Sequence, residues 1–173
     1  MSVSLFDVSA VSYLQVLNAV SGFLDKGKSH FAETGIDLSD IVAFRLIDDM
    51  SPFQFQIISV AHHSMGALQA LESGEFTPPM GYGEPDYEGL QALIQQAIEA
   101  VGAADRDAID QCVGKKLIFK IGDNEVPFTA ENFVNSFSLP NFYFHAATAY
   151  DMLRMKGVPL GKLDFIGALR MGT

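Results

Sequence analysis

Hydrophobic residues recur at helical spacing in three long stretches of the chain. The first covers residues 5–34 and ends before Gly35, a residue type that favours the end of a helix. The second begins at about Pro52 and stops at Gly74, and the third runs over residues 87–101. The apolar positions that define the second stretch are Ile57, Val60, Ala61, Ala67, Leu68 and Leu71. These patterns predict three helices, each with a buried face.

A fourth helix is predicted for residues 140–157, which read PNFYFHAATAYDMLRMKG. Proline is favoured in the first turn of a helix and glycine just beyond its end, which matches Pro140 and Gly157. Asn141 and His145 are one helical turn apart, so their side chains lie on the same side of this helix. This pair is the first candidate for chemistry in the chain.

Residues 115–130 differ from the rest of the chain, because two short apolar runs flank Gly122, Asp123 and Asn124. This arrangement is typical of a β-hairpin, and Pro127 restricts its second strand to an edge position. The predicted fold class is therefore all-α: an up-down four-helix bundle with a small β-hairpin before the last helix. A chain of 173 residues fits one domain that spans residues 1–173.

The composition narrows the possible partners and the cellular location. The net charge of −10 repels phosphate backbones, and no basic cluster reverses it locally, so nucleic acid is a poor candidate partner. No apolar run reaches the ~18 residues that indicate a membrane span. The first ten residues lack the pattern of a signal peptide. We expect a soluble cytoplasmic protein that binds neither nucleic acid nor membrane.

Histidine is scarce, and three of the four histidines fall on predicted helices where a site could form. His62 and His63 lie in the middle of the second helix, and His145 lies in the middle of the fourth. His63 is closer to the buried stripe at about 100° per residue, but the other faces of that helix are apolar too, so His62 stays a candidate. Each histidine is either a hydrogen-bonded packing residue or part of a site between helices.

The order of elements, the central His62–His63 pair and the stretch from Pro140 to Gly167 resemble the DinB-like four-helix bundle superfamily. Within it, the chain resembles a branch described as a domain of unknown function. The resemblance implies a divalent metal, zinc or nickel, held by His62 or His63 together with Asn141 and His145. Asn141 stands where the superfamily pattern has a third histidine. A neutral amide is a poor ligand for these metals, so binding is expected to be weak.

Two further interpretations remain open at this stage. Without metal, His145 could move a proton on a small molecule, with Tyr150 as a further donor. The functional hypothesis is thus a small-molecule-binding protein or a metal-dependent enzyme with a degenerate His/Asn/His site. The alternative is a metal-free binding or structural protein that works as a homodimer, because relatives in the superfamily are often dimeric.

Overall fold

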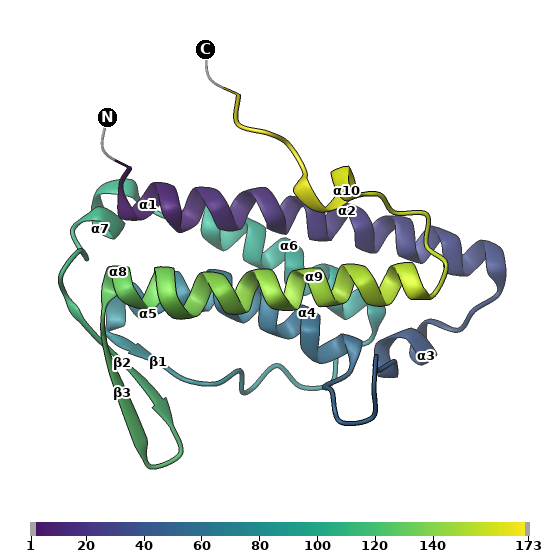
Figure 1. Ribbon diagram of the computed structural model, residues 1–173, viewed down its shortest axis with the longest axis horizontal. Helices are drawn as coiled ribbons and strands as arrows, with labels where there is room; N and C mark the ends of the chain where they lie inside the picture. The colour runs from purple at the N-terminus through teal and green to yellow at the C-terminus, as the bar shows by residue number, and fades with distance from the viewer. Residues whose placement is uncertain (1–2, 172–173) are drawn as a thin grey trace.

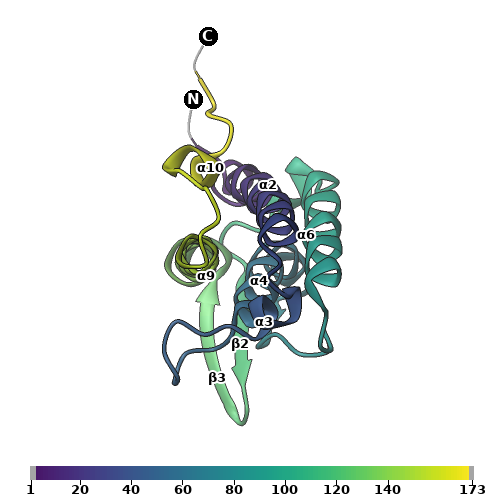
Figure 2. The same ribbon diagram turned by 90° about the vertical axis from the view of Figure 1, so that its right-hand side faces the viewer.

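Four long helical segments lie side by side along the long axis of the molecule, as Figure 1 shows from the side and Figure 2 nearly end-on. The computed structural model describes residues 3–171. The segments are α2 (Ala10–Thr34); α4 (Phe53–Ala61), η1 (His62–Gly66) and α5 (Ala67–Ser73) in one run; α6 (Tyr87–Gly102); and α8 (Ala130–Phe133), η2 (Val134–Ser138) and α9 (Leu139–Met155) in another. The predominantly helical fold is confirmed. No helix within residues 3–171 has the length and hydrophobicity to cross a membrane.

Short helices join and flank these segments. They are α1 (Leu5–Val8), α3 (Leu38–Ala43), α7 (Arg106–Asp110) and α10 (Lys162–Ile166). The predicted first helix is interrupted at Ser9, which separates α1 from α2. Gly35 and Gly74 end their helices with φ angles of 71° and 78°, a left-handed conformation that glycine adopts without strain. The predicted helix ends are confirmed at both positions.

The fourth helical segment begins earlier than the sequence predicts. Thr129 caps it by accepting a hydrogen bond from the backbone N–H of Asn132, and α8 and η2 precede α9. Pro140 therefore lies inside a continuous helical run rather than at its start. The run tolerates this proline because Pro140 has no N–H to pair, and the wider π-helical turn before it relieves the clash of its ring with preceding carbonyls.

The predicted hairpin is confirmed, and the structure adds a third strand to it. Strand β2 (Lys116–Ile121) pairs antiparallel with β3 (Asn124–Thr129), with Ile121 opposite Asn124 at the turn. Strand β1 (Glu75–Phe76) pairs parallel with β2 on its other side. The strand order β1-β2-β3 leaves β3, with Pro127, at an edge as predicted. The sequence gives no sign of β1 because two residues carry no measurable alternation.

Aromatic side chains fill the centre of the core between the helical segments. Tyr13, Phe23, Phe31, Phe53, Tyr87, Phe133 and Phe142 are fully buried. Tyr13 packs edge-on against Phe142, with ring centroids 5.0 Å apart, and thereby joins α2 to α9. Phe53 stacks on Tyr87 at 6.1 Å and joins α4 to α6. Burial of each such ring contributes about 2 kcal/mol, so these pairs fix how the helices are arranged.

Gly27 sets how closely α2 and α6 approach. A Cβ atom at this position would lie 2.5 Å from the hydroxyl oxygen of Tyr87. That hydroxyl donates a hydrogen bond of 2.9 Å to the backbone carbonyl of Leu24, so it cannot move away without loss. Helix α2 runs through Gly27 without interruption. The close packing of α2 against Tyr87 of α6 explains why position 27 is a glycine.

We expect the substitution Gly27→Ala to lower the free energy of unfolding by about 1–3 kcal/mol, because the added methyl group overpacks the contact with Tyr87. Gly22→Ala is the matched control on the same helix, since no atom lies within 4 Å of the added Cβ. The control should be neutral or stabilise by up to about 1 kcal/mol. Urea denaturation of the two variants measures both effects, and equal stabilities would contradict the packing role.

Candidate functional site

Two π-helical turns interrupt the long helices, and both lie at the candidate site. Turn η1 contains His62 and His63, and turn η2 immediately precedes the helix of His145. A π-helical turn inserts an extra residue, which redirects side chains and changes the pairing of backbone carbonyls. Such turns are frequent at functional sites. The two turns therefore single out the part of the molecule that holds the candidate histidines.

A buried chain of hydrogen bonds joins the two π-helical turns to α2. The Ser138 hydroxyl donates to the backbone carbonyl of His63 at 2.8 Å, and the Tyr13 hydroxyl donates to Ser138 at 2.8 Å. Ser138 and Tyr13 are fully buried, and burial raises the pKa of the Tyr13 hydroxyl, which stays protonated. The chain thus fixes the backbone that carries His63 relative to the start of α9.

His62 points away from α9 and holds the loop between β1 and α6. Its Nε2–H donates to the backbone carbonyl of Thr77 at 2.7 Å, and its Nδ1 accepts from the Tyr82 hydroxyl at 3.1 Å. The carbonyl oxygen accepts only, which assigns the proton to Nε2. Burial lowers the pKa of His62, although the bond to Thr77 opposes that shift. Since both ring nitrogens are used, His62 has a structural role.

His63 faces α9 and stacks on His145. The two ring centroids are 6.1 Å apart and the ring planes differ by 16°. Phe76 and Phe137 pack around His63 with centroids at 5.3 Å and 5.6 Å. The Nδ1 atom of His63 is buried without a hydrogen-bond partner. Of the two adjacent histidines, His63 is the one that belongs with His145, as its closeness to the buried stripe indicates.

The tautomer of His145 follows from a relay of hydrogen bonds. The side-chain amide nitrogen of Gln56 donates to the backbone carbonyl of Ser51 at 2.9 Å, which turns the amide oxygen toward His145. That oxygen lies 2.8 Å from His145 Nδ1 and can only accept, so Nδ1 carries the proton. The Nε2 atom of His145 is therefore an unprotonated acceptor. It makes no hydrogen bond within residues 3–171 and is not fully buried.

Both stacked imidazoles are neutral at pH 7. Burial, with smaller contributions from His62 and His145, lowers the pKa of His63 to about 3. Burial alone lowers the pKa of His145 to about 4. No carboxylate is hydrogen-bonded to either ring among the described residues, so nothing offsets the cost of burying a charge there. The site offers hydrogen-bonding groups without net charge.

Asn141 and Tyr150 do not join this pair as the sequence suggests. Asn141 donates its side-chain N–H to the backbone carbonyl of Phe137 at 2.7 Å, on its own helix. Tyr150 packs against Phe23 and Phe165 with centroids at 6.2 Å and 5.7 Å. Because Tyr150 is five residues after His145, it lies about 140° around α9 and faces α2. Tyr150 therefore does not share a face of α9 with His145, and its acid–base role stays a prediction.

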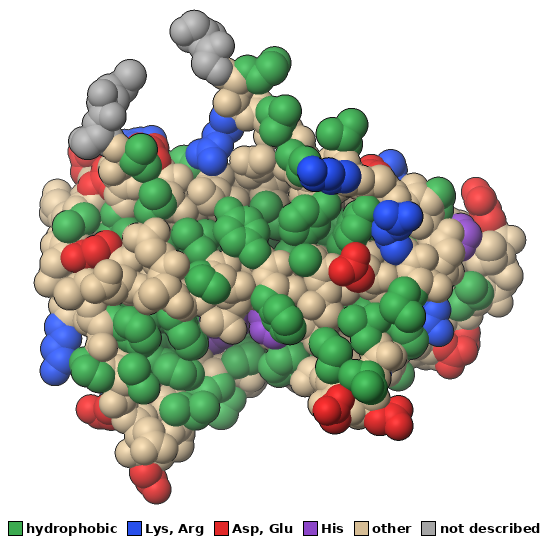
Figure 3. Space-filling view, viewed as in Figure 1, with side chains coloured by type: hydrophobic (Ala, Val, Ile, Leu, Met, Phe, Trp, Pro, Cys, Tyr) green, Lys and Arg blue, Asp and Glu red, His purple; other side chains and the backbone are tan. Residues whose placement is uncertain are grey.

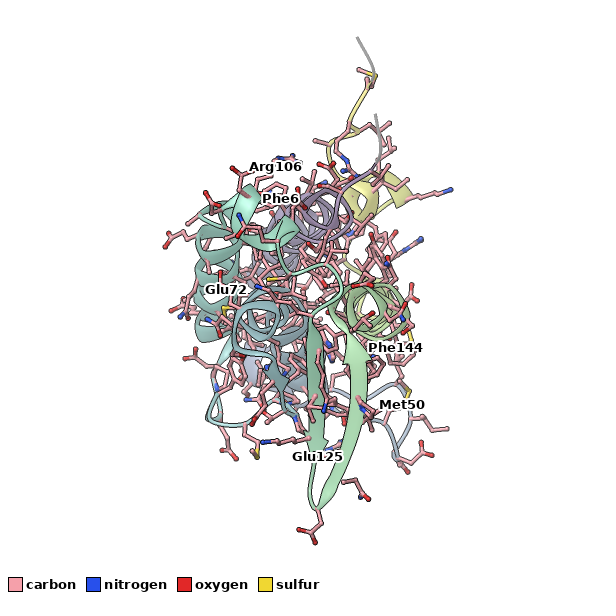
Figure 4. The ribbon with its side chains drawn as sticks, turned by 90° about the vertical axis from the view of Figure 1, so that its left-hand side faces the viewer. Phe6, Met50, Glu72, Arg106, Glu125 and Phe144 are labelled. Atoms are coloured by element: carbon pink, nitrogen blue, oxygen red, sulfur yellow. The ribbon has the colours of Figure 1, made fainter. Side chains whose placement is uncertain are left out.

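The site opens onto one face of the molecule. Figure 3 shows histidine side chains in a hollow beneath the ridge of α9, bordered by hydrophobic side chains. Phe55 and Phe144 contact His145 edge-on, with centroids at 5.9 Å and 5.2 Å. Figure 4 shows Phe144 projecting from α9 on the same side of the molecule as Met50. The surroundings of the His145 ring are thus aromatic and partly open.

The donor set fits a zinc or nickel centre poorly. His62 uses both ring nitrogens elsewhere, and Asn141 offers only a neutral amide oxygen. That leaves His63 and His145, whereas a zinc site normally has at least three protein ligands. Within residues 3–171, no cluster of three histidine, cysteine, aspartate or glutamate side chains could hold a metal ion. We therefore assign no chemical step to a metal.

The class of protein is defined by the fold. The structure is similar to the crystal structure of a DinB family member protein from Shewanella denitrificans, with a TM-score of 0.81 and 20% sequence identity. The match covers 98% of this chain and 95% of that chain, which establishes a DinB-like fold.

The family model for a domain of unknown function, DUF1993, matches residues 5–166. The chain therefore belongs to this family, which confirms the predicted DinB-like branch. No curated protein matches the chain.

The lowered pKa values predict how stability depends on pH. Between pH 6.5 and about 4, the unfolded chain binds protons at His63 and His145 while the folded protein binds none. The stability present above pH 6.5 should therefore decrease as the pH falls, by about 1.4 kcal/mol per pH unit for each histidine. Urea denaturation at pH 7 and pH 5 should show a smaller loss for His145→Gln than for the wild type. Equal losses would contradict the assignment. A comparison of pH 8 with pH 7 is the control, because both histidines are then mostly uncharged in the folded and the unfolded protein.

Proposed function

We propose that this protein binds a small uncharged molecule in the hollow beneath α9 through a hydrogen bond to Nε2 of His145. The relay from Ser51 through Gln56 carries this proposal, because it leaves His145 with a free acceptor on a neutral ring. The matching ligand group is an O–H or N–H donor. A free acceptor beside aromatic walls is the arrangement of a few oriented polar groups in an apolar site.

Electrostatics favour an uncharged ligand over an anion. Neither His63 nor His145 carries a positive charge at neutral pH, since the pKa values are about 3 and 4. The chain carries a net charge of −10, which repels anions at long range. The Phe55 and Phe144 rings at the site favour an apolar body on the ligand.

Binding is favoured over proton-transfer catalysis. A general base works best when its pKa is near the operating pH, and the pKa of His145 is about 4. The ring would hold an abstracted proton poorly unless the ligand itself raised that pKa. The second candidate, a metal-dependent enzyme, would need a ligand beyond His63 and His145, and Asn141 is already bonded to the Phe137 carbonyl. We rank it below metal-independent binding.

The test uses phenol, which has an apolar ring and one O–H donor, with anisole as the matched compound that lacks the donor. In buffer with a metal chelator, ¹⁵N NMR of histidine-labelled protein should show Nδ1–H at His145 without ligand. Phenol should shift the Nε2 resonance of His145. It should bind about fivefold more tightly than anisole, a ratio that corresponds to the net free energy of one hydrogen bond.

Two variants complete this test. Gln56→Leu removes the acceptor for Nδ1–H and should weaken phenol binding, whereas His145→Ala should abolish the preference for phenol over anisole. Equal binding of the two compounds by the wild type would exclude the proposal. Binding that appears only when zinc is added would favour the metal-dependent candidate.

We also infer that the four long helical segments form an up-down bundle of the DinB type and that two copies associate. Large hydrophobic side chains are exposed on the linker before α4, on the hairpin and on α9: Ile47, Ile121, Val126 and Phe144. Figure 3 shows hydrophobic side chains gathered over the hairpin and α9 on one face. A second copy that covers this face would remove them from water.

Light scattering should give a mass of twice the 18.8 kDa of one chain. The substitution Phe144→Glu should shift the protein to a monomer, because it places a charge in the proposed interface. Leu163→Glu is the control, since Leu163 is exposed on α10, away from the hairpin. A monomeric wild type, or equal effects of the two substitutions, would exclude this interface.

A further inference from the structure

Two polar side-chain atoms in the core have no hydrogen-bond partner, and both belong to the helical segment formed by α4, η1 and α5. They are Ser59 Oγ and His63 Nδ1, the only side-chain nitrogen or oxygen atoms within residues 3–171 that are fully buried without a hydrogen bond. Ser59 is 1% exposed and His63 is 6% exposed. An unpartnered buried polar group costs about 1–3 kcal/mol, so each of the two calls for an explanation.

The two atoms come from one face of the helix. Ser59 lies three residues after Gln56 and four residues before His63. Gln56 forms a hydrogen bond with His145, and His63 stacks on His145. Ser59 lies between Gln56 and His63 on the same face of the helix, so this face is turned toward α9. Residues four apart on a helix have their Cβ atoms about 6 Å apart, which is within the reach of one bridging water molecule.

Ser64 shows what a helical serine does when it has no such role. Its hydroxyl donates to the backbone carbonyls of Val60 and Ala61 at 2.8 Å and 3.0 Å. This local bonding is the usual way in which a helix satisfies a serine. The Ser59 hydroxyl makes no bond of this kind, and it is therefore available to another partner.

We propose that Ser59 is a further residue of the site and that its hydroxyl donates a hydrogen bond to Nδ1 of His63. The hydrogen bond forms in one of two ways. It is direct once the Ser59 side chain has rotated about its Cα–Cβ bond, or it passes through one bridging water molecule. It satisfies both unpartnered atoms at once. It also assigns the proton of the neutral His63 ring to Nε2, because Nδ1 is then the acceptor.

The consequence is a donor and an acceptor side by side. His63 presents Nε2–H, and the neighbouring His145 presents an unprotonated Nε2. One hydroxyl group matches both, since it donates to His145 and accepts from His63. This ligand class rests on the proposed binding at His145, and it is an uncharged alcohol or phenol. An amine on an aromatic ring donates well but accepts poorly, so it matches only half of the site.

The first experiment needs no ligand and therefore tests Ser59 separately from the proposed function. The ¹⁵N shifts of His63 should show the proton predominantly on Nε2 in the wild type. Ser59→Ala should lower the ratio of the Nε2–H to the Nδ1–H tautomer by about fivefold. Ser64→Ala, an equally buried serine with its own partners, should leave the ratio unchanged. A wild-type proton on Nδ1, or equal ratios in all three proteins, would overturn the proposal.

The second experiment compares phenol with aniline, which keeps the donor but is a weak acceptor. The wild type should bind phenol about fivefold more tightly than aniline, and Ser59→Ala should remove most of this difference. An unchanged difference in Ser59→Ala would overturn the role of Ser59 in ligand choice. If phenol does not bind at all, the proposed function fails, and the tautomer measurement still decides the role of Ser59.

Discussion

The structure around the site depends on one buried hydrogen bond, from the Ser138 hydroxyl to the backbone carbonyl of His63. It joins two π-helical turns that come from different long helices, and Tyr13 extends it to a third helix. A π-helical turn changes the pairing of carbonyls within its own helix, and here a side chain from another helix supplies a partner. The irregular turn thus becomes a fixed point between helices, and His63 and His145 take their separation from it.

This arrangement gives the two adjacent histidines different roles. His62 anchors the loop between β1 and α6 through Thr77 and Tyr82 and has no free nitrogen. His63 turns toward α9 and stacks on His145, and its buried Nδ1 is the atom for which we propose Ser59 as the partner. Burial keeps both stacked rings neutral, so the site offers hydrogen-bonding groups rather than charge. The same burial makes His145 a better hydrogen-bond acceptor than proton carrier at neutral pH.

The sequence singled out His63 and His145, which stack in the structure, but not the groups that contact them. Helical spacing places His63 near the buried stripe of its helix, and the structure buries it. Spacing could not reveal Gln56, because its importance comes from a bond to a residue 89 positions away. Tyr150 lies on the same helix as His145, but helical rotation turns it toward α2. Proximity along a helix is therefore a weak guide to a shared site.

The sequence by itself determined the predominantly helical fold, the hairpin with Pro127 at its edge and the helix ends at Gly35 and Gly74. These features follow from local periodicity and from backbone conformations that only certain residues adopt. Only the tertiary structure decided the two π-helical turns, the short strand β1 and the tautomer of His145. Each of these depends on contacts between segments that are distant in the chain, and no local pattern encodes such contacts.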